Sequence, residues 1–146
     1  AGATVEVHGF VEDMPALYRR VDLCVGRSGA TTVAECCVGG IGALYIPLPW
    51  AAEDHQTANA QAVVRVGGAE ILPQHEADGP RLAIRIAHYA GDRRAVAALG
   101  QGARSLARPR AAAQVAALVR ASGLGQGTRR VDARRRHRHR LSREPA

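Results

Sequence analysis

The chain has 146 residues, enough for one domain with a buried core, and no apolar run approaches the roughly 20 residues of a membrane span. Hydrophobic residues make up 47% of the chain but include only three Tyr, one Trp and one Phe, so Ala, Val, Leu and Ile must fill the core. The net charge of +7 lies mostly at one end, which argues against a uniformly basic nucleic-acid-binding surface.

The basic charge is concentrated in the last 24 residues. Residues 1–122 hold 12 Arg and 11 acids, a balance of +1, whereas residues 123–146 hold 8 Arg and 2 acids, a balance of +6. We therefore expect one domain over 1–122, followed by a basic, disordered tail. Binding of a polyanion or an anionic membrane through this tail is an alternative function, supported by the Arg run alone.

The three cysteines predict neither disulfides nor a metal site. Cys24, Cys36 and Cys37 are odd in number, two of them are adjacent, and no C-x-x-C spacing occurs. We expect small, buried, reduced thiols in a cytosolic protein without a secretory signal, and no metal or other cofactor.

The first half of the chain predicts strands and helices in alternation. Val5 and Val7 alternate with polar neighbours, Asp13 is a good N-cap, and Pro15 is tolerated early in a helix. The expected elements are a strand over 4–10, a helix from Asp13, a strand over 21–25, a helix over 30–38 and a strand over 43–46.

The second half continues the alternation. It predicts a helix over 53–66, a strand over 69–72, helices over 78–89 and 92–106, and a last helix from Pro109. The expected inner faces are Val33, Ala34 and Cys37; then Ala58, Ala62 and Val66; and finally Val115, Leu118 and Val119. Such alternation predicts an α/β fold with a parallel sheet covered by helices on both faces.

The turn before the helix at Ala30 has the features of an anion site. Ser28 and Gly29 allow a tight bend, and a diphosphate would find free N–H donors at the helix start, on Ala30, Thr31 and Thr32. Glu35 lies one turn further in, where its carboxylate could accept hydrogen bonds from a ribose diol. The alternative is a capping turn with Glu35 as a solvated helix acid.

A second helix start offers amide side chains. Gln56 and Asn59 are three residues apart and share a helix face, and amides suit sugar hydroxyls because they both donate and accept. His55 could cap the helix, donate to a phosphate or face solvent. A polar face exposed to water is the alternative for the two amides, and Asp54 is most simply a helix-start acid.

Two further positions carry open interpretations. Trp50 either shelters a ligand or anchors its loop, and the end of the first strand at Phe10 and Val11 is either a base-binding edge or an ordinary strand end. No nucleophile elbow, metalloprotease motif, P-loop or dinucleotide fingerprint occurs, so we assign no catalytic residue.

Three stretches together resemble the carboxyl-terminal domain of the MurG family of bacterial N-acetylglucosaminyltransferases, glycosyltransferase family 28. They are residues 9–14 (GFVEDM), 27–35 (RSGATTVAE) and 54–60 (DHQTANA), with 45–49 (YIPLP) between them. The resemblance covers about residues 4–120. It implies a Rossmann-like half of a two-domain GT-B enzyme, incomplete at its start, that binds UDP-N-acetylglucosamine.

The resemblance also implies residue roles. The Val11 backbone would contact uracil, the amides of Ala30, Thr31 and Thr32 would contact the diphosphate, and Glu35 would hold the ribose hydroxyls. Gln56 and Asn59 would hold the sugar. Ser28 and His55 would also belong to the residues that bind the donor. The parent enzyme would transfer the sugar with inversion to lipid I, undecaprenyl-diphospho-muramoyl-pentapeptide, in peptidoglycan synthesis. It would be cytoplasmic and peripheral on the inner face of the cell membrane, without a specific nucleic-acid partner.

The resemblance covers only part of the family's two-domain enzyme, which limits the activity that we expect of this chain. The acceptor-binding domain of the family, which would supply the catalytic base and the membrane-docking surface, has no counterpart here. We expect the chain alone to be inactive in transfer and to bind UDP-sugar weakly or not at all. A donor domain of another UDP-sugar transferase, of the glycolipid-synthase type, is the alternative within the same architecture.

Overall fold

The computed structural model describes residues 4–49 and 54–123. The chain divides into two compact units, Ala1–Arg108 and Pro109–Ala146. The first unit contains the sheet and all the candidate site residues. In the second, the described residues form one helix, α6 (Ala111–Ala121).

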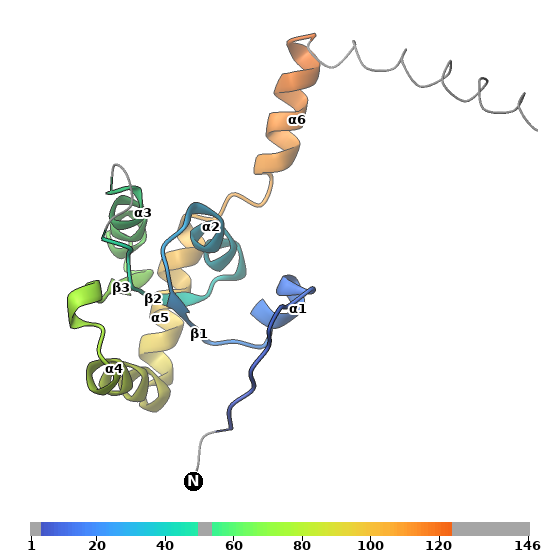
Figure 1. Ribbon diagram of the computed structural model, residues 1–146. Coiled ribbons are helices and arrows are strands. Elements are labelled where there is room, and N and C mark those ends of the chain that lie inside the picture. Colours follow the sequence, from blue (N-terminus) through green and yellow to red (C-terminus); the bar gives the residue numbers. More distant parts are fainter. Residues whose placement is uncertain (1–3, 50–53, 124–146) are drawn as a thin grey trace, which may run out of the picture. The chain divides into compact units, whose positions relative to one another are not determined.

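Three short strands form one parallel sheet in the first unit (Figure 1). They are β1 (Leu23–Gly26), β2 (Gly42–Tyr45) and β3 (Ala69–Ile71), and their order in the sheet is β1-β2-β3. Cys24 pairs with Ala43, and Ala43 with Ala69. Because all three strands run in the same direction, their carboxyl ends meet at one edge of the sheet.

The helices follow the expected alternation. They are α1 (Met14–Tyr18), α2 (Ala30–Gly39), α3 (His55–Val64), the 3-10 helix η2 (Gln74–Glu76), α4 (Gly79–Gly91) and α5 (Arg93–Ser105). Side chains of Asp13, Asp78 and Asp92 accept hydrogen bonds from amides in the first turns of α1, α4 and α5. Gly40 ends α2 in the left-handed conformation with φ 67°.

Helices cover both faces of the sheet, which confirms the predicted α/β class. On one face, buried residues of the strands pack with residues of α2 and α3 and with one residue of α5. The cluster consists of Cys37, Ala43, Tyr45, Ala60, Val63, Ala69 and Ala103. On the other face, Glu70 of β3 accepts a hydrogen bond from Tyr89 of α4 and pairs with Arg85. Figure 1 shows α2 and α3 above the sheet and α4 below it.

Helix α5 lies against the amino ends of β2 and β3, and glycines permit the approach. A Cβ atom at Gly102 would lie 2.5 Å from the Val66 carbonyl oxygen, and one at Gly68 would overlap the Ala103 backbone. The amino edge of the sheet is therefore closed by α5, while the carboxyl edge carries the starts of α2 and α3.

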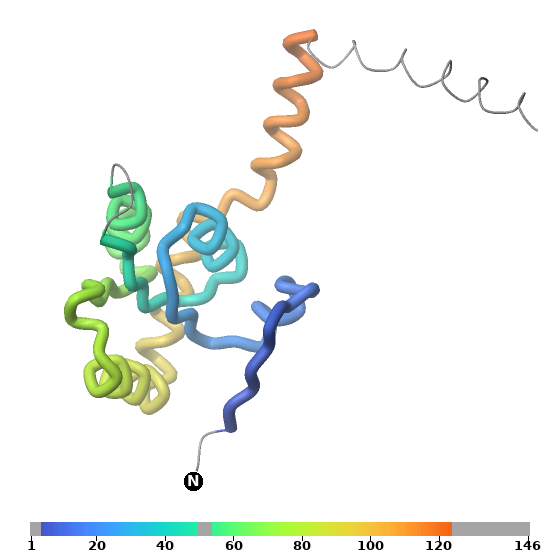
Figure 2. Tube along the Cα trace, in the orientation of Figure 1, coloured from blue at the N-terminus to red at the C-terminus, as the bar shows by residue number. Residues whose placement is uncertain are grey.

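The strand predicted over 4–10 is wrong. These residues pair with no described strand, and Val5, Val7 and Phe10 are 77%, 91% and 82% exposed. Figure 2 shows the segment leading into α1 as an isolated stretch of chain. The alternating pattern was correct for a strand, but a strand also needs a hydrogen-bonding neighbour.

Three predicted inner faces need correction. Ala34 of α2 is exposed, although Val33 and Cys37 pack inward as expected. In α3 the buried residues are Ala60 and Val63, whereas Ala58 and Val66 are exposed. Along α6, the apolar side chains that were expected to face inward are exposed as well, namely Val115, Leu118 and Val119.

Candidate functional site

The starts of α2 and α3 meet at the carboxyl edge of the sheet, and neither has a side-chain cap. The N-cap of α2 is Gly29, which has no side chain to accept a hydrogen bond. The N-cap of α3 is Asp54, in the left-handed region with φ 49°, and its carboxylate makes no capping bond. The amides of Ala30, Thr31 and Thr32 precede the first intrahelical bond of α2, from the Val33 amide to the Gly29 carbonyl. These are the donors that bind an anion at a helix start.

Side chains predicted as ligand contacts join the two helix starts. Ser28 is fully buried, and its hydroxyl donates to the Gln56 carbonyl at 2.8 Å. Asn59 donates through Nδ2 to the Ser28 carbonyl at 3.1 Å. Gln56 and Asn59 are both half-buried. The two bonds fix the turn before α2 against the first turn of α3.

Hydrogen bonds also join the loop after β2 to the start of α3 and to the turn before α2. The Leu48 amide donates to Gln56 Oε1 at 3.0 Å, and Arg27 donates to the carbonyls of Ile46 at 2.9 Å and Pro47 at 3.3 Å. Gln56 Nε2 takes no part in the Leu48 bond and is chemically able to donate to a ligand. Trp50 lies outside the described residues.

Glu35 has a partner that the sequence did not predict. The Tyr18 hydroxyl, from the end of α1, donates to Glu35 Oε2 at 3.1 Å. Burial and this bond to the carboxylate raise the pKa of Tyr18 above its ordinary value. Glu35 is half-buried.

Tyr18 and Glu35 share a mainly apolar cavity of about 410 Å³ between α1 and α2. Its remaining lining comes from Met14, Pro15, Arg19, Ala34, Val38 and Gly39. Val11 lies beside a second cavity of about 580 Å³, lined also by Phe10, Asp13 and Leu17. Both cavities border α1.

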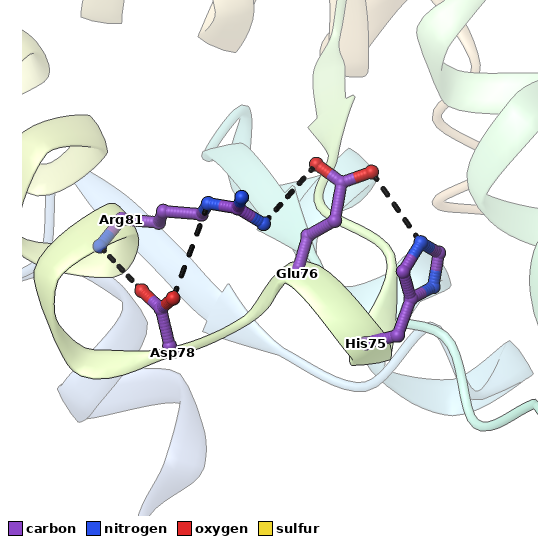
Figure 3. A network of polar contacts seen from close by, with 4 residues as sticks. All are labelled: His75, Glu76, Asp78 and Arg81. Atoms are coloured by element: carbon purple, nitrogen blue, oxygen red, sulfur yellow. Dashed lines mark hydrogen bonds and ion pairs between the residues drawn. The ribbon is translucent and has the colours of Figure 1, made fainter.

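Sequence reasoning missed a polar network at the end of β3. Figure 3 shows Glu76 between His75 and Arg81, with Asp78 also contacting Arg81. The ion-pair distances are 3.5 Å from His75 to Glu76, and 3.9 Å from Arg81 to each acid. His75 also borders a cavity of about 490 Å³ whose walls include Pro47, Pro49, Thr57, Ile71 and Pro73. The sequence signal that could have predicted this network is the close spacing of His75, Glu76, Asp78 and Arg81.

The cysteines lie behind the site, in the interior. All three are free thiols, and Cys36 and Cys37 are buried as predicted, whereas Cys24 is half-buried. The hydrogen bond from the Cys36 thiol favours the Cys24 thiolate, which lowers the pKa of Cys24 while raising that of Cys36. Within the described residues, no group of three His, Cys, Asp or Glu side chains gathers to hold a metal ion.

The arrangement combines three kinds of binding group along one edge. Backbone donors stand at the start of α2, a fixed carboxylate lies one turn into α2, and amide groups lie at the start of α3. Such a set suits an elongated polar ligand with an anionic centre and hydroxyl groups at its ends. No helix of residues 4–49 or 54–123 has the length and apolar character to cross a lipid bilayer.

A comparison with protein families identifies the chain. The model of the glycosyltransferase family 28 C-terminal domain matches residues 1–115. This chain belongs to that family. The family 28 assignment agrees with the resemblance carried by residues 9–14, 27–35 and 54–60, and with the α/β fold.

Relatives of known activity share this domain. The family 28 chain is 46% identical over 113 residues to a UDP-N-acetylglucosamine–N-acetylmuramyl-(pentapeptide) pyrophosphoryl-undecaprenol N-acetylglucosamine transferase of Halorhodospira halophila, covering 77% of this chain and 32% of the relative. The enzyme of the same name from Alkalilimnicola ehrlichii is 44% identical over 116 residues, with 80% and 32% covered. The chain thus spans about a third of the length of these relatives.

Two solved structures have the same fold as this chain. Acinetobacter baumannii MurG superposes with a TM-score of 0.72 at 35% identity, over 81% of this chain and 34% of that one. The glycotransferase of kitacinnamycin superposes with a TM-score of 0.56 at 24% identity, over 81% and 32%, and supports the fold alone.

Proposed function

We propose that residues 1–122 form the donor-binding part of a GT-B glycosyltransferase and that their ligand is UDP-N-acetylglucosamine. The observation that carries the proposal is the pair of uncapped helix starts, α2 and α3, joined by Ser28 and Asn59 at the carboxyl edge of a parallel sheet. The family assignment and the names of the relatives supply the choice of donor.

The diphosphate lies at the start of α2 in this proposal. The amides of Ala30, Thr31 and Thr32 donate to its oxygens, and the helix dipole favours its charge. Ser28 contributes through the shape of the turn, because its hydroxyl is already used in the bond to Gln56. A metal ion is not required by this set of donors, since backbone amides and the dipole meet the charge.

The two ends of the donor lie on either side of the diphosphate. Glu35 accepts hydrogen bonds from the ribose hydroxyls, and the backbone of Val11 contacts uracil. On the other side, Gln56 and Asn59 bind the sugar, and His55 at the α3 start completes the donor contacts. Amides and a carboxylate together match a ligand that offers many hydroxyl groups.

The whole enzyme would transfer the sugar to the 4-hydroxyl of lipid I. The acceptor oxygen attacks the anomeric carbon from the face opposite the phosphate, the bond to phosphate breaks, and the configuration inverts. UDP leaves with the bonding electrons, and the α2 amides stabilise its growing charge. The acceptor, the catalytic base and docking to the inner membrane face belong to a partner domain in this proposal, so these 146 residues alone do not turn over.

Calorimetric titration with UDP-N-acetylglucosamine tests the proposal. We expect weak, saturable binding, and Glu35→Ala should weaken it by about tenfold or more because a charge-assisted hydrogen bond is lost. Asp22→Ala is the matched control, since it removes an exposed acid before β1, at the opposite edge. Equal affinity of the two variants would refute the ribose contact. Preference for UDP-glucose or UDP-galactose would favour a glycolipid synthase instead.

A further inference from the structure

We propose that Tyr18 is a positioning residue for the ribose contact: its hydroxyl holds the Glu35 carboxylate in the orientation that receives the diol. This inference rests on the proposed function, because it assigns Tyr18 a part in the same donor site. Tyr18 itself need not touch the ligand.

The geometry that carries the inference is a bond between two helices. Tyr18 is the last residue of α1, and its hydroxyl lies 3.1 Å from Glu35 Oε2 across 17 positions of sequence. Asp13 fixes the start of α1 through a bond from the Ala16 amide at 2.8 Å. The tyrosine is therefore held at its backbone and half-buried at its ring, so it can hold the more flexible acid.

The hydrogen-bond chemistry leaves room for the ligand. An ionised carboxylate accepts up to four hydrogen bonds, and Tyr18 uses one position on Oε2. Oε1 and the second position on Oε2 stay chemically able to accept from two ribose hydroxyls. Both side chains line the cavity of about 410 Å³, so the carboxylate is reached from a space of ligand size.

Pre-ordering explains why the contact should matter for affinity. Fixing a Glu side chain at the moment of binding costs conformational entropy, and a prior bond removes part of that cost. The same bond should also favour ligands that carry the diol over ligands that lack it. A role confined to stability would lower affinity for both kinds of ligand equally.

The molecule contains a matched control for this bond. Tyr89 of α4 donates to Glu70 of β3 at 2.8 Å, and it too joins a helix to an acid on another element. Its partner lies on the face of the sheet that α4 covers, away from the starts of α2 and α3. Tyr89→Phe therefore removes the same atom and the same type of bond outside the proposed site.

The experiment is an amide-resolved NMR titration of the 146-residue chain with UDP and with 2′,3′-dideoxy-UDP. We expect Tyr18→Phe to weaken UDP binding about fivefold and to leave the dideoxy ligand within about twofold. In a Glu35→Gln background, Tyr18→Phe should add no further loss, because the two residues act as a unit. Tyr89→Phe should leave both affinities unchanged.

Each other result overturns a specific statement. Equal losses for the two ligands, or no loss for UDP, would refute the positioning role of Tyr18. Equal binding of the two ligands by the unaltered chain would refute the contact between Glu35 and the diol. Failure of the unaltered, folded chain to bind UDP would refute the proposed function and this inference with it.

Discussion

Ser28 has a structural role at the centre of the candidate site. It is fully buried, its hydroxyl donates to the Gln56 carbonyl, and its own carbonyl accepts from Asn59. The residue thereby connects the turn before α2 to the first turns of α3. A buried hydroxyl with a good partner stabilises the fold modestly, but the partner left behind after its removal is costly.

Ser28→Ala should lower the free energy of unfolding by about 1–2 kcal/mol, because the Gln56 carbonyl loses its buried donor. Ser105→Ala is the control, since Ser105 donates to the Gly102 carbonyl at 2.7 Å on an exposed surface. Urea unfolding of both variants measures the difference. Losses of the same size in the two variants would contradict a special role for Ser28.

The sequence predicted which residues lie near one another at the candidate site. It did not predict the hydrogen-bond partners of those residues. The strand-to-helix junctions at 28–30 and 54–56 were identifiable from composition and spacing. The bonds of Ser28 and Asn59 were not, because their partners lie 28 and 31 positions away. The bond from Tyr18 to Glu35 was missed for the same reason.

At the scale of elements, α5 determines how tightly the amino ends of β2 and β3 are closed. Gly102 faces the chain at 66–67 with no room for a side chain. In Gly102→Ala, the new Cβ would lie 2.5 Å from backbone atoms, which cannot move like a flexible side chain. The helix would have to shift away from the sheet.

We expect Gly102→Ala to destabilise the fold by about 1–3 kcal/mol through overpacking. Gly91→Ala, in α4, has nothing within 4 Å of the added Cβ and should be neutral or slightly stabilising, because alanine favours helix. Thermal unfolding of the two variants compares them directly. A stabilised Gly102→Ala would show that α5 does not approach the sheet this closely.

Helix α4 is attached to the sheet by Tyr89, whose pKa is raised to about 12 by burial and by the bond to Glu70. The ordinary value is 10.0, so the unfolded chain loses this proton first as the pH rises. The advantage of the unaltered chain over Tyr89→Phe should be about 1–2 kcal/mol and constant below pH 10. Between pH 10 and 12 it should shrink. Denaturant midpoints across this range measure it, and an advantage that grew with pH would contradict the assignment.

Element types were predictable where local chemistry decides them. Asp13 was predicted as an N-cap, and it caps α1. The helices predicted to begin at Asp78 and Asp92 are capped by those residues in α4 and α5. The prediction of a strand over 4–10 was wrong because strand pairing depends on a partner that is distant in the sequence. The prediction of the inner face of α3 was wrong because two polar residues lie on its inner side. Asn59 donates to the Ser28 carbonyl, and Gln56 accepts from the Leu48 amide.

At the scale of the whole molecule, we propose that donor binding and basic charge belong to different parts of the chain. The candidate site lies in the first unit, and the expected basic tail over 123–146 falls almost wholly outside the described residues. The chain spans about a third of the length of the relatives it matches.

Removal of residues 123–146 should separate the two properties. UDP-N-acetylglucosamine affinity should be unchanged, because every proposed contact lies between Val11 and Asn59. Binding to heparin or DNA, which an Arg-rich segment supports in a salt-dependent way, should be lost. Loss of donor binding on truncation, with the amide spectrum of the domain preserved, would contradict this division.

The central claim is that the start of α2 receives the diphosphate. The most direct test is the amide NMR spectrum of the chain titrated with UDP-N-acetylglucosamine. We predict the largest shift changes at the amides of Ala30, Thr31 and Thr32, with smaller changes at Glu35 and Gln56. Saturable changes confined to the amino edge near Arg104, or none at the three α2 amides, would contradict it.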